Sequence, residues 1–174
     1  MLGKRNVFLI GPMGSGKTAV GKYIARLTGA PFYDSDAEIE HRTGVDIPFI
    51  FEKEGEAGFR QREREAIAAL TQFEPIVLAT GGGAVLLEDN RRCLAARGCV
   101  VYLETSIAQQ TNRVRRGRNR PLLSGADPTL KLTELMRHRG PLYTEIADIV
   151  VTTDGRKVAA VAEDIMRGLE ARNL

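Results

Sequence analysis

The chain has 174 residues, enough for one domain with a sizeable core, and its hydrophobic content of 43% and charged content of 27% are those of a globular protein. The net charge of +3 is mildly basic, which suits small anionic ligands as readily as nucleic acid. The apolar runs are short, so we expect neither a membrane span nor a signal peptide. Cys93 and Cys99 are too few for a disulfide framework, and we expect reduced thiols in a cytoplasmic protein.

Short apolar runs alternate with helical patterns along the chain, without an internal repeat or a linker. The runs predict strands at 7–10, 31–33, 76–79, 100–103 and 149–151. Helical spacing of apolar residues predicts helices at 18–27, 37–42, 47–54, 58–72, 89–97, 107–115, 129–139 and 158–172. This alternation favours an α/β domain with a parallel sheet covered by helices on both faces. Ligands of such sheets bind at the carboxyl ends of the strands.

The segment 11–18 reads Gly-Pro-Met-Gly-Ser-Gly-Lys-Thr, which fits the pattern G-x-x-x-x-G-K-[ST] between a predicted strand and a predicted helix. In such a loop, backbone N–H groups converge on phosphate oxygens at a helix N-terminus, where the dipole favours an anion. Lys17 would reach the β- and γ-phosphates, and the Thr18 hydroxyl would ligate Mg²⁺ directly. The residues expected at the nucleoside triphosphate are Gly14, Ser15, Gly16, Lys17, Thr18 and Ala19.

Two carboxylates, Asp34 and Asp36, follow the second predicted strand at the same edge of the sheet. Helix capping alone would explain them, since Asp is a common N-cap residue. Alternatively, Asp34 contacts Mg²⁺ through a water and Asp36 contacts an acceptor hydroxyl. Related phosphotransferases often hold Mg²⁺ with an Asp after the third strand. This chain has Gly81, Gly82 and Gly83 there, either as a tight turn or as N–H donors facing the acceptor, which leaves the metal's outer shell to Asp34.

Arginines crowd the segment 113–120, and Arg137 and Arg139 follow. Such a run is often a solvated face, and a basic cluster can also bind nucleic acid. No aromatic residue interleaves with these arginines, so we expect no nucleic-acid partner. The segment 117–128 lacks a periodic pattern and has a length that suits a mobile lid closing on phosphate charge. Arg60 and Glu63 form either a surface ion pair of about 0.3 kcal/mol or a guanidinium held for a carboxylate ligand.

The ordered set of these motifs resembles the shikimate kinases over nearly the whole chain. Besides the phosphate loop, the matching segments are Asp34-Ser35-Asp36, Ile47-Pro48 with Phe51, Phe59-Arg60 with Glu63, Gly81-Gly82-Gly83, Arg120-Pro121-Leu122-Leu123, and Arg139 before Pro141-Leu142-Tyr143. The resemblance implies a single domain, 1–174, with the nucleoside-monophosphate-kinase-like P-loop fold and a five-stranded parallel sheet. It places a lid at about 113–127 and acceptor-binding helices at about 35–63. It implies transfer of the ATP γ-phosphate to the 3-hydroxyl of shikimate, with Mg²⁺, in aromatic amino-acid biosynthesis.

The resemblance also implies residue roles. Asp36 would contact the ring hydroxyls of shikimate, and Arg60 and Arg139 would hold its carboxylate. Arg120 would be the lid arginine on the phosphates, so that Lys17, Asp36 and Arg120 form the catalytic set. The remaining expected contacts are Gly81, Gly82, Gly83, Phe51 and Phe59 at shikimate, and Arg113 and Arg156 at adenine. A plain core role explains either Phe equally well, and Asp36 either accepts the hydroxyl proton or only orients the hydroxyl.

Other functions stay open at this point. A small-molecule kinase acting on gluconate or on a nucleoside monophosphate would share the loop and the lid, and the Arg60 and Arg139 pair is the feature that favours shikimate. The same fold can serve as the ligand-sensing module of a regulator, which normally has a DNA-binding segment, and only ten residues precede the loop. A nucleic-acid-binding ATPase is disfavoured by the missing aromatic residues. We expect a monomer.

Overall fold

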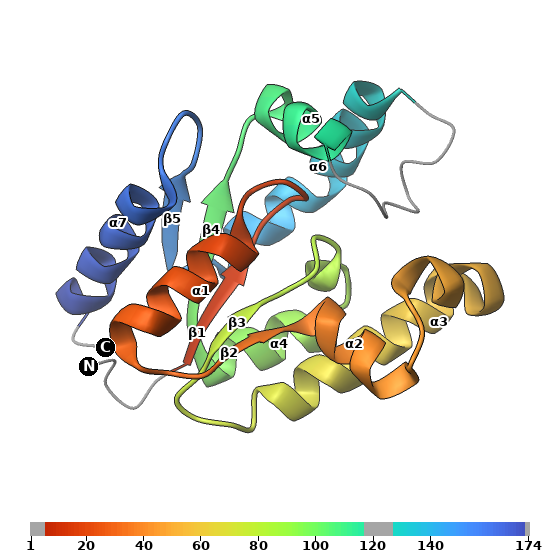
Figure 1. Cartoon of the computed structure of the whole chain (residues 1–174), viewed down its shortest axis with the longest axis horizontal. Coiled ribbons are helices and arrows are strands. Elements are labelled where there is room, and N and C mark those ends of the chain that lie inside the picture. The colour runs from red at the N-terminus through yellow and green to blue at the C-terminus, as the bar shows by residue number, and fades with distance from the viewer. Residues whose placement is uncertain (1–5, 117–126, 173–174) are drawn as a thin grey trace.

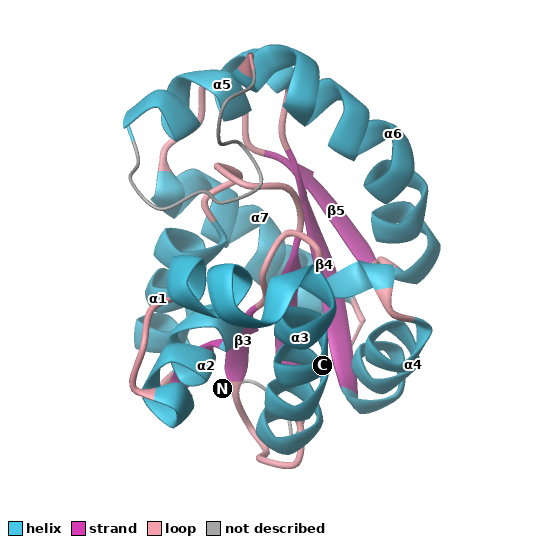
Figure 2. Ribbon diagram, turned by 90° about the vertical axis from the view of Figure 1, so that its right-hand side faces the viewer, coloured by secondary structure: helices cyan, strands magenta, loops and turns pink. Residues whose placement is uncertain are grey.

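The computed structural model describes residues 6–116 and 127–172. A five-stranded parallel sheet with strand order β2-β3-β1-β4-β5 forms its centre. The strands are β1 (Asn6–Ile10), β2 (Phe32–Asp34), β3 (Val77–Ala79), β4 (Gly98–Glu104) and β5 (Ile149–Thr152). Helices lie on both faces of the twisted sheet, as Figures 1 and 2 show. The predicted parallel sheet covered on both faces is therefore confirmed.

Two apolar layers enclose the sheet. The helices are α1 (Lys17–Thr28), α2 (Ser35–Thr43), α3 (Ile47–Leu70), α4 (Glu88–Arg97), α5 (Ile107–Arg116), α6 (Pro128–Ile146) and α7 (Val158–Ala171), with a 3₁₀ turn η1 (Ala84–Leu86). In β1, Val7 and Leu9 pack with α1 and α7, whereas Phe8 and Ile10 pack with α3, α4 and α6. Because both faces are covered, every β1 residue is buried, which explains its continuous apolar run.

A smaller apolar cluster lies between α2 and α3, beside the sheet. It contains Ile39, Ile50, Phe59 and Ala66, and Figure 1 shows the two helices extending away from the β2 edge. The next residue of α3, Ile67, belongs to the core under the sheet. The predicted acceptor helices at 35–63 thus have a core of their own, joined to the sheet through α3.

Helix boundaries follow local chemistry in most places. Asp34 caps α2, so this helix begins at Ser35, before the predicted residue 37. The predicted helices 47–54 and 58–72 correspond to α3, interrupted at Gly55, whose φ of 70° and ψ of −176° are not helical. The η1 turn was not predicted.

The predicted end of the helix 129–139 was wrong, because α6 continues through Pro141 to Ile146. Proline lacks the N–H and its ring crowds the preceding turn, which is why the sequence pattern favoured an end before it. The fully buried Tyr143 stacks on Tyr102 of β4, with ring centroids 5.1 Å apart. Packing of the last turns of α6 against the sheet therefore outweighs the local preference.

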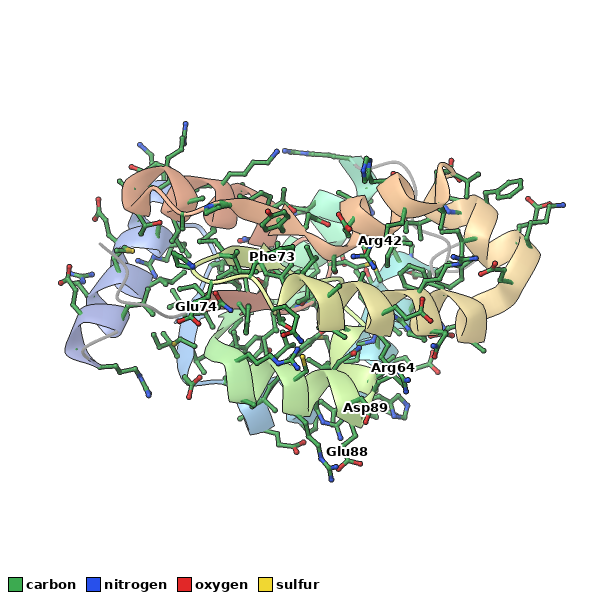
Figure 3. All side chains as sticks on the ribbon, turned by 90° about the horizontal axis from the view of Figure 1, so that it is seen from below. Arg42, Arg64, Phe73, Glu74, Glu88 and Asp89 are labelled. Carbon is green, nitrogen blue, oxygen red and sulfur yellow. The ribbon has the colours of Figure 1, made fainter. Side chains whose placement is uncertain are left out.

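The far side of α3 is polar, and Figure 3 shows Arg64 next to Asp89 of α4. Arg64 Nη1 and Asp89 Oδ2 are 2.9 Å apart in this exposed ion pair. Such pairs contribute about 0–1 kcal/mol, so the position of α3 depends mainly on its buried apolar residues. Within residues 6–116 and 127–172, none of the helices combines the length and the apolar character needed to cross a lipid bilayer.

Candidate active site

The phosphate loop joins the end of β1 to α1. Gly14 and Gly16 have φ of 74° and 90°, a left-handed conformation that glycine adopts without strain. A Cβ on Gly11 would lie 2.7 Å from the backbone oxygen of Leu103, so a side chain there would collide with β4. The Lys17 ammonium donates hydrogen bonds to the Gly11 carbonyl at 2.7 Å and to a neighbouring carbonyl at 2.8 Å. The ammonium group of Lys17 therefore lies inside the loop.

Asp34 is the N-cap of α2 and also contacts Thr18 of the phosphate loop. Its Oδ1 accepts hydrogen bonds from the backbone N–H groups of Asp36 and Ala37, at 2.9 and 3.2 Å, which is an N-cap. Its Oδ2 accepts a hydrogen bond from Thr18 Oγ1 at 2.9 Å. A hydroxyl and a carboxylate are oxygen donors of the kind that Mg²⁺ prefers, with waters and phosphates as the other ligands. Among the described residues no group of three or more His, Cys, Asp or Glu side chains is placed to hold a metal by itself.

The glycines after β3 are held by α2 and α6. The Gly81 N–H donates to Ser35 Oγ at 3.0 Å, and the Tyr143 hydroxyl donates to the Gly82 carbonyl. Ser35 and Tyr143 are both fully buried. Two helices that are distant in sequence therefore fix the backbone of this loop.

Side chains of the site lie directly over these glycines. A Cβ on Gly81 would be 2.8 Å from Glu63 Oε2 and 2.9 Å from Asp36 Oδ1, and one on Gly83 would overlap the Arg60 guanidinium. At Gly82 the nearest neighbours would be the backbone nitrogen of Met13 at 3.4 Å and Arg139 Nη1 at 3.5 Å. At Gly81 and Gly83, therefore, only glycine lets these side chains approach the backbone so closely, whereas a Cβ on Gly82 would make ordinary van der Waals contacts.

Arg60, Glu63 and Arg139 form a buried charged cluster. Arg60 is 8% exposed, Glu63 0% and Arg139 4%. Arg60 Nη1 lies 2.8 Å from Glu63 Oε1, which excludes the surface ion pair considered above, and Arg60 Nη2 lies 3.2 Å from the exposed Glu56. Burial lowers the pKa of Arg139, and the nearby charge of Arg60 lowers it further. Burial raises the pKa of Glu63 against the attraction of Arg60. The cluster thus holds two cations in a weakly solvated place.

A pocket of about 270 Å³ adjoins the phosphate loop and the first turn of α1. The lining includes Ser15, Gly16, Ala19, Arg113, Arg156 and Val158. Arg113 Nη1 donates to the Gly14 carbonyl at 2.6 Å, and Arg156 Nη2 lies 2.6 Å from Asp164 Oδ2. The two arginines predicted at adenine therefore come together from α5 and from the β5–α7 loop.

The remaining predicted residues divide into three groups. Phe59 is 4% exposed and belongs to the α2–α3 core, with its ring 4.8 Å from that of the partly buried Phe51. The Arg60 guanidinium lies 5.1 Å from the Phe59 ring centroid, so the two side chains form a cation–π contact. Arg115 and Arg116 are exposed. Arg120 and most of the predicted lid lie outside the described residues.

Tyr143 received no role in the sequence analysis, and whether Glu63 holds Arg60 for a ligand stayed open there. The helical spacing of Arg60 and Glu63 was visible, but burial is what makes Glu63 part of the site. Tyr143 belongs to a matched motif, yet its contact with Gly82, 61 positions earlier, could not be inferred from spacing.

The geometry defines a class. A phosphate loop follows the central strand of a parallel sheet, and carboxylates, glycines and buried arginines gather at neighbouring strand ends. This is the arrangement of a P-loop kinase for a small acceptor. A family model described as shikimate kinase matches residues 13–170.

Relatives agree with this class. The shikimate kinase of Nitrosococcus oceani is 56% identical over 164 residues, which are 94% of this chain and 86% of the relative. The solved structure of shikimate kinase from Acinetobacter baumannii in complex with shikimate has a TM-score of 0.96 and 46% identity, over 99% of this chain and 97% of that one. A gluconokinase structure from Sinorhizobium meliloti shares the fold alone, with 17% identity and a TM-score of 0.59, over 97% of this chain and 93% of the other. The chain belongs to the shikimate kinase family, and it is an ATP-dependent kinase of shikimate.

Proposed function

We propose that this chain transfers the γ-phosphate of ATP to the 3-hydroxyl of shikimate in a site at the carboxyl ends of β1, β2 and β3. One observation supports this assignment most strongly. Arg60 and Arg139 are both buried, and Glu63 is the single fully buried acidic side chain of residues 6–116 and 127–172. Two buried cations beside one buried anion favour the binding of a further anion, because an unpaired buried charge is costly. The carboxylate of the acceptor meets this need through bidentate, charge-assisted hydrogen bonds.

Asp36 contacts the acceptor hydroxyl in this proposal. Its Oδ1 and Glu63 Oε2 both lie within 3 Å of the position that a Cβ on Gly81 would take, which puts it beside the glycine loop and close to the arginine cluster. A loose phosphoryl-transfer transition state demands little base strength, so orienting the hydroxyl is the larger contribution. In this proposal Phe51 lies next to the bound shikimate, and Phe59 packs in the α2–α3 core behind the shikimate site.

Lys17, Thr18 and Asp34 act on the ATP side. Lys17 lies within the loop and supplies positive charge to the β- and γ-phosphates. Thr18 and Asp34 fit a Mg²⁺ ion, the first as a direct ligand and the second through a water, since their oxygens are already neighbours. Bound with ATP, Mg²⁺ would neutralise charge on the phosphate oxygens.

The pocket between Arg113 and Arg156 takes the adenine. It adjoins Ser15, Gly16 and Ala19 of the phosphate loop and α1, so a nucleotide whose phosphates occupy the loop reaches it directly. Arg120 completes the site as the lid arginine on the transferring phosphoryl group. The protein acts as a monomer in the cytoplasm, which suits an ATP-consuming enzyme whose Cys93 and Cys99 form no disulfide.

A coupled assay of ADP release tests this function, with shikimate, gluconate and nucleoside monophosphates offered separately. We expect turnover with shikimate and less than about one hundredth of that kcat/KM with nucleoside monophosphates, which lack a carboxylate and would leave the buried arginines mispaired at a cost on the order of 3 kcal/mol. Gluconate has a carboxylate but no ring, so we expect slower turnover because its hydroxyls lie in other positions relative to that carboxylate. Equal turnover with gluconate would show that the arginine pair binds carboxylates without distinguishing shikimate from other acceptors. Absence of turnover with shikimate would overturn the assignment.

A further inference from the structure

The geometry points to a positioning function for the Tyr143 hydroxyl: it joins Arg139 to the glycine loop and so holds the carboxylate-binding guanidinium in register with the phosphate loop. This inference rests on the function proposed above. It begins from the burial of Tyr143, which is fully enclosed and stacks on Tyr102 with ring centroids 5.1 Å apart. A hydroxyl in such a place needs partners, because a buried polar group without them is costly.

The hydroxyl has one partner on each side. It donates to the Gly82 carbonyl, and the Arg139 guanidinium, from four residues earlier on α6, interacts electrostatically with it. An independent distance supports the same arrangement, since Arg139 Nη1 would be 3.5 Å from a Cβ on Gly82. Tyr143, Arg139 and Gly82 therefore form a compact triangle.

Gly82 in turn lies next to the phosphate loop. A Cβ there would be 3.4 Å from the Met13 nitrogen and 3.6 Å from the Gly11 oxygen. The glycine backbone thus lies between the arginine that would hold the acceptor and the loop that would hold the donor. A fixed Gly82 sets the spacing between the two, and the Tyr143 hydroxyl is the side-chain group that fixes its carbonyl. Precise spacing matters because small displacements of reacting groups lower the rate.

The decisive variant is Tyr143→Phe, which keeps the ring and its stacking and removes only the hydroxyl. We expect the KM for shikimate to rise by roughly five- to tenfold, the size of one lost hydrogen bond beside a charged group. The KM for ATP should change little, because the nucleotide contacts are untouched, whereas the melting temperature should fall by a few degrees, because the Gly82 carbonyl loses a buried hydrogen bond. Tyr102→Phe is the matched control, since it removes a hydroxyl from the neighbouring ring.

A double-mutant cycle with Arg139→Lys separates positioning from packing. If Tyr143 acts through Arg139, the Tyr143→Phe effect on the shikimate KM shrinks to less than half in the Arg139→Lys background. Additive losses, an unchanged KM in Tyr143→Phe, or an equal loss in Tyr102→Phe would each overturn the inference.

A spectroscopic readout keeps this test independent of the substrate assignment. In ¹H–¹⁵N spectra of the protein without acceptor, we expect Tyr143→Phe to shift or broaden the Gly82 and Gly83 amide signals, while Tyr102→Phe leaves them in place. Unaltered signals in Tyr143→Phe would overturn the positioning function. If instead the wild-type protein fails to phosphorylate shikimate while these signals respond, the substrate assignment fails and the structural link stands.

Discussion

Thr18 and Asp34 are joined by a 2.9 Å hydrogen bond from Thr18 Oγ1 to Asp34 Oδ2, across 16 positions of sequence. The bond connects the first turn of α1 with the end of β2. It brings a proposed direct Mg²⁺ ligand next to the carboxylate proposed to contact the ion through a water. Asp34 is thus proposed for the metal site and Asp36 for the acceptor site, so substitutions at these two residues should affect different steps.

Asp34→Asn should raise the Mg²⁺ concentration needed for half-maximal rate by roughly tenfold, because a carboxylate of the metal's outer shell becomes neutral. Asparagine is as good an N-cap as aspartate, so α2 should stay intact. Asp36→Asn should instead lower kcat and acceptor affinity while the KM for ATP stays nearly unchanged. Mg²⁺ titrations of both variants decide this, and identical curves would show that the two roles are divided wrongly.

Lys17→Met should abolish turnover without unfolding the protein. Its ammonium is the mobile positive charge inside the loop, and loss of such an electrostatic contact costs about 3–4 kcal/mol, a few hundredfold or more in rate. Steady-state kinetics and a melting curve provide the measurement. Near-wild-type activity in this variant would contradict the assignment of the loop.

Arg60→Ala and Arg139→Ala should each lower kcat/KM for shikimate by roughly thirtyfold or more, at a cost of about 2–4 kcal/mol, with the KM for ATP nearly unchanged. Lysine should restore little, because it keeps the charge and loses the planar fork. Since both arginines act on one group, the double variant should fall short of the summed losses.

A decarboxylated analogue of shikimate provides the control for the arginine pair. Wild type should discriminate strongly against it, and the two alanine variants should not. Variants that still discriminate as strongly as wild type would show that the arginines do not bind the carboxylate.

Gly83→Ala should raise the KM for shikimate severalfold or more. The φ of Gly83 is −97°, which alanine tolerates, so the expected effect comes from contact and not from backbone strain. The added methyl group would collide with the Arg60 guanidinium and displace it from Glu63. Gly140→Ala is the control, since a Cβ there meets only Met136 Cε, at 3.7 Å. An unaffected KM in Gly83→Ala would mean that Arg60 can relocate freely.

Glu63 should make stability depend on pH in an unusual direction. Burial raises its pKa in the folded protein, so its contribution is fully present below the unfolded value of about 4.3 and is lost as the pH rises through the folded value. The melting-temperature difference between Glu63→Gln and wild type should therefore move in favour of the variant from about pH 4 to pH 7. The exposed Glu65, two positions on, supplies Glu65→Gln as the matched control for removing one carboxylate from α3. Movement toward wild type would show that the attraction of Arg60 exceeds the burial effect.

Much of this architecture is local in origin and was therefore predictable. Buried runs such as β1, with a glycine-rich loop and an amphipathic helix after it, specify the strand–loop–helix unit within a few residues of sequence. Strand ends meet at one edge of a parallel sheet, so Asp34, Asp36 and Gly81 were expected together before any contact was known.

The features that the sequence did not predict depend on tertiary contacts. Nothing in the segment around Pro141 reveals that Tyr143 packs on Tyr102. That contact stabilises the part of α6 that follows the proline. Likewise, a helical spacing of three suits an exposed ion pair as well as the enclosed pair of Arg60 and Glu63. Burial depends on the whole fold, and periodicity along one helix does not determine it.

The separate apolar cluster of α2 and α3 has an evolutionary consequence. Ile39, Ile50 and Phe59 are not part of the two cores that enclose the sheet. Substitutions that reshape this end of the molecule therefore leave the strand framework and the phosphate loop intact. Sequence changes can therefore accumulate in the α2–α3 cluster without disturbing the packing of the two cores that enclose the sheet.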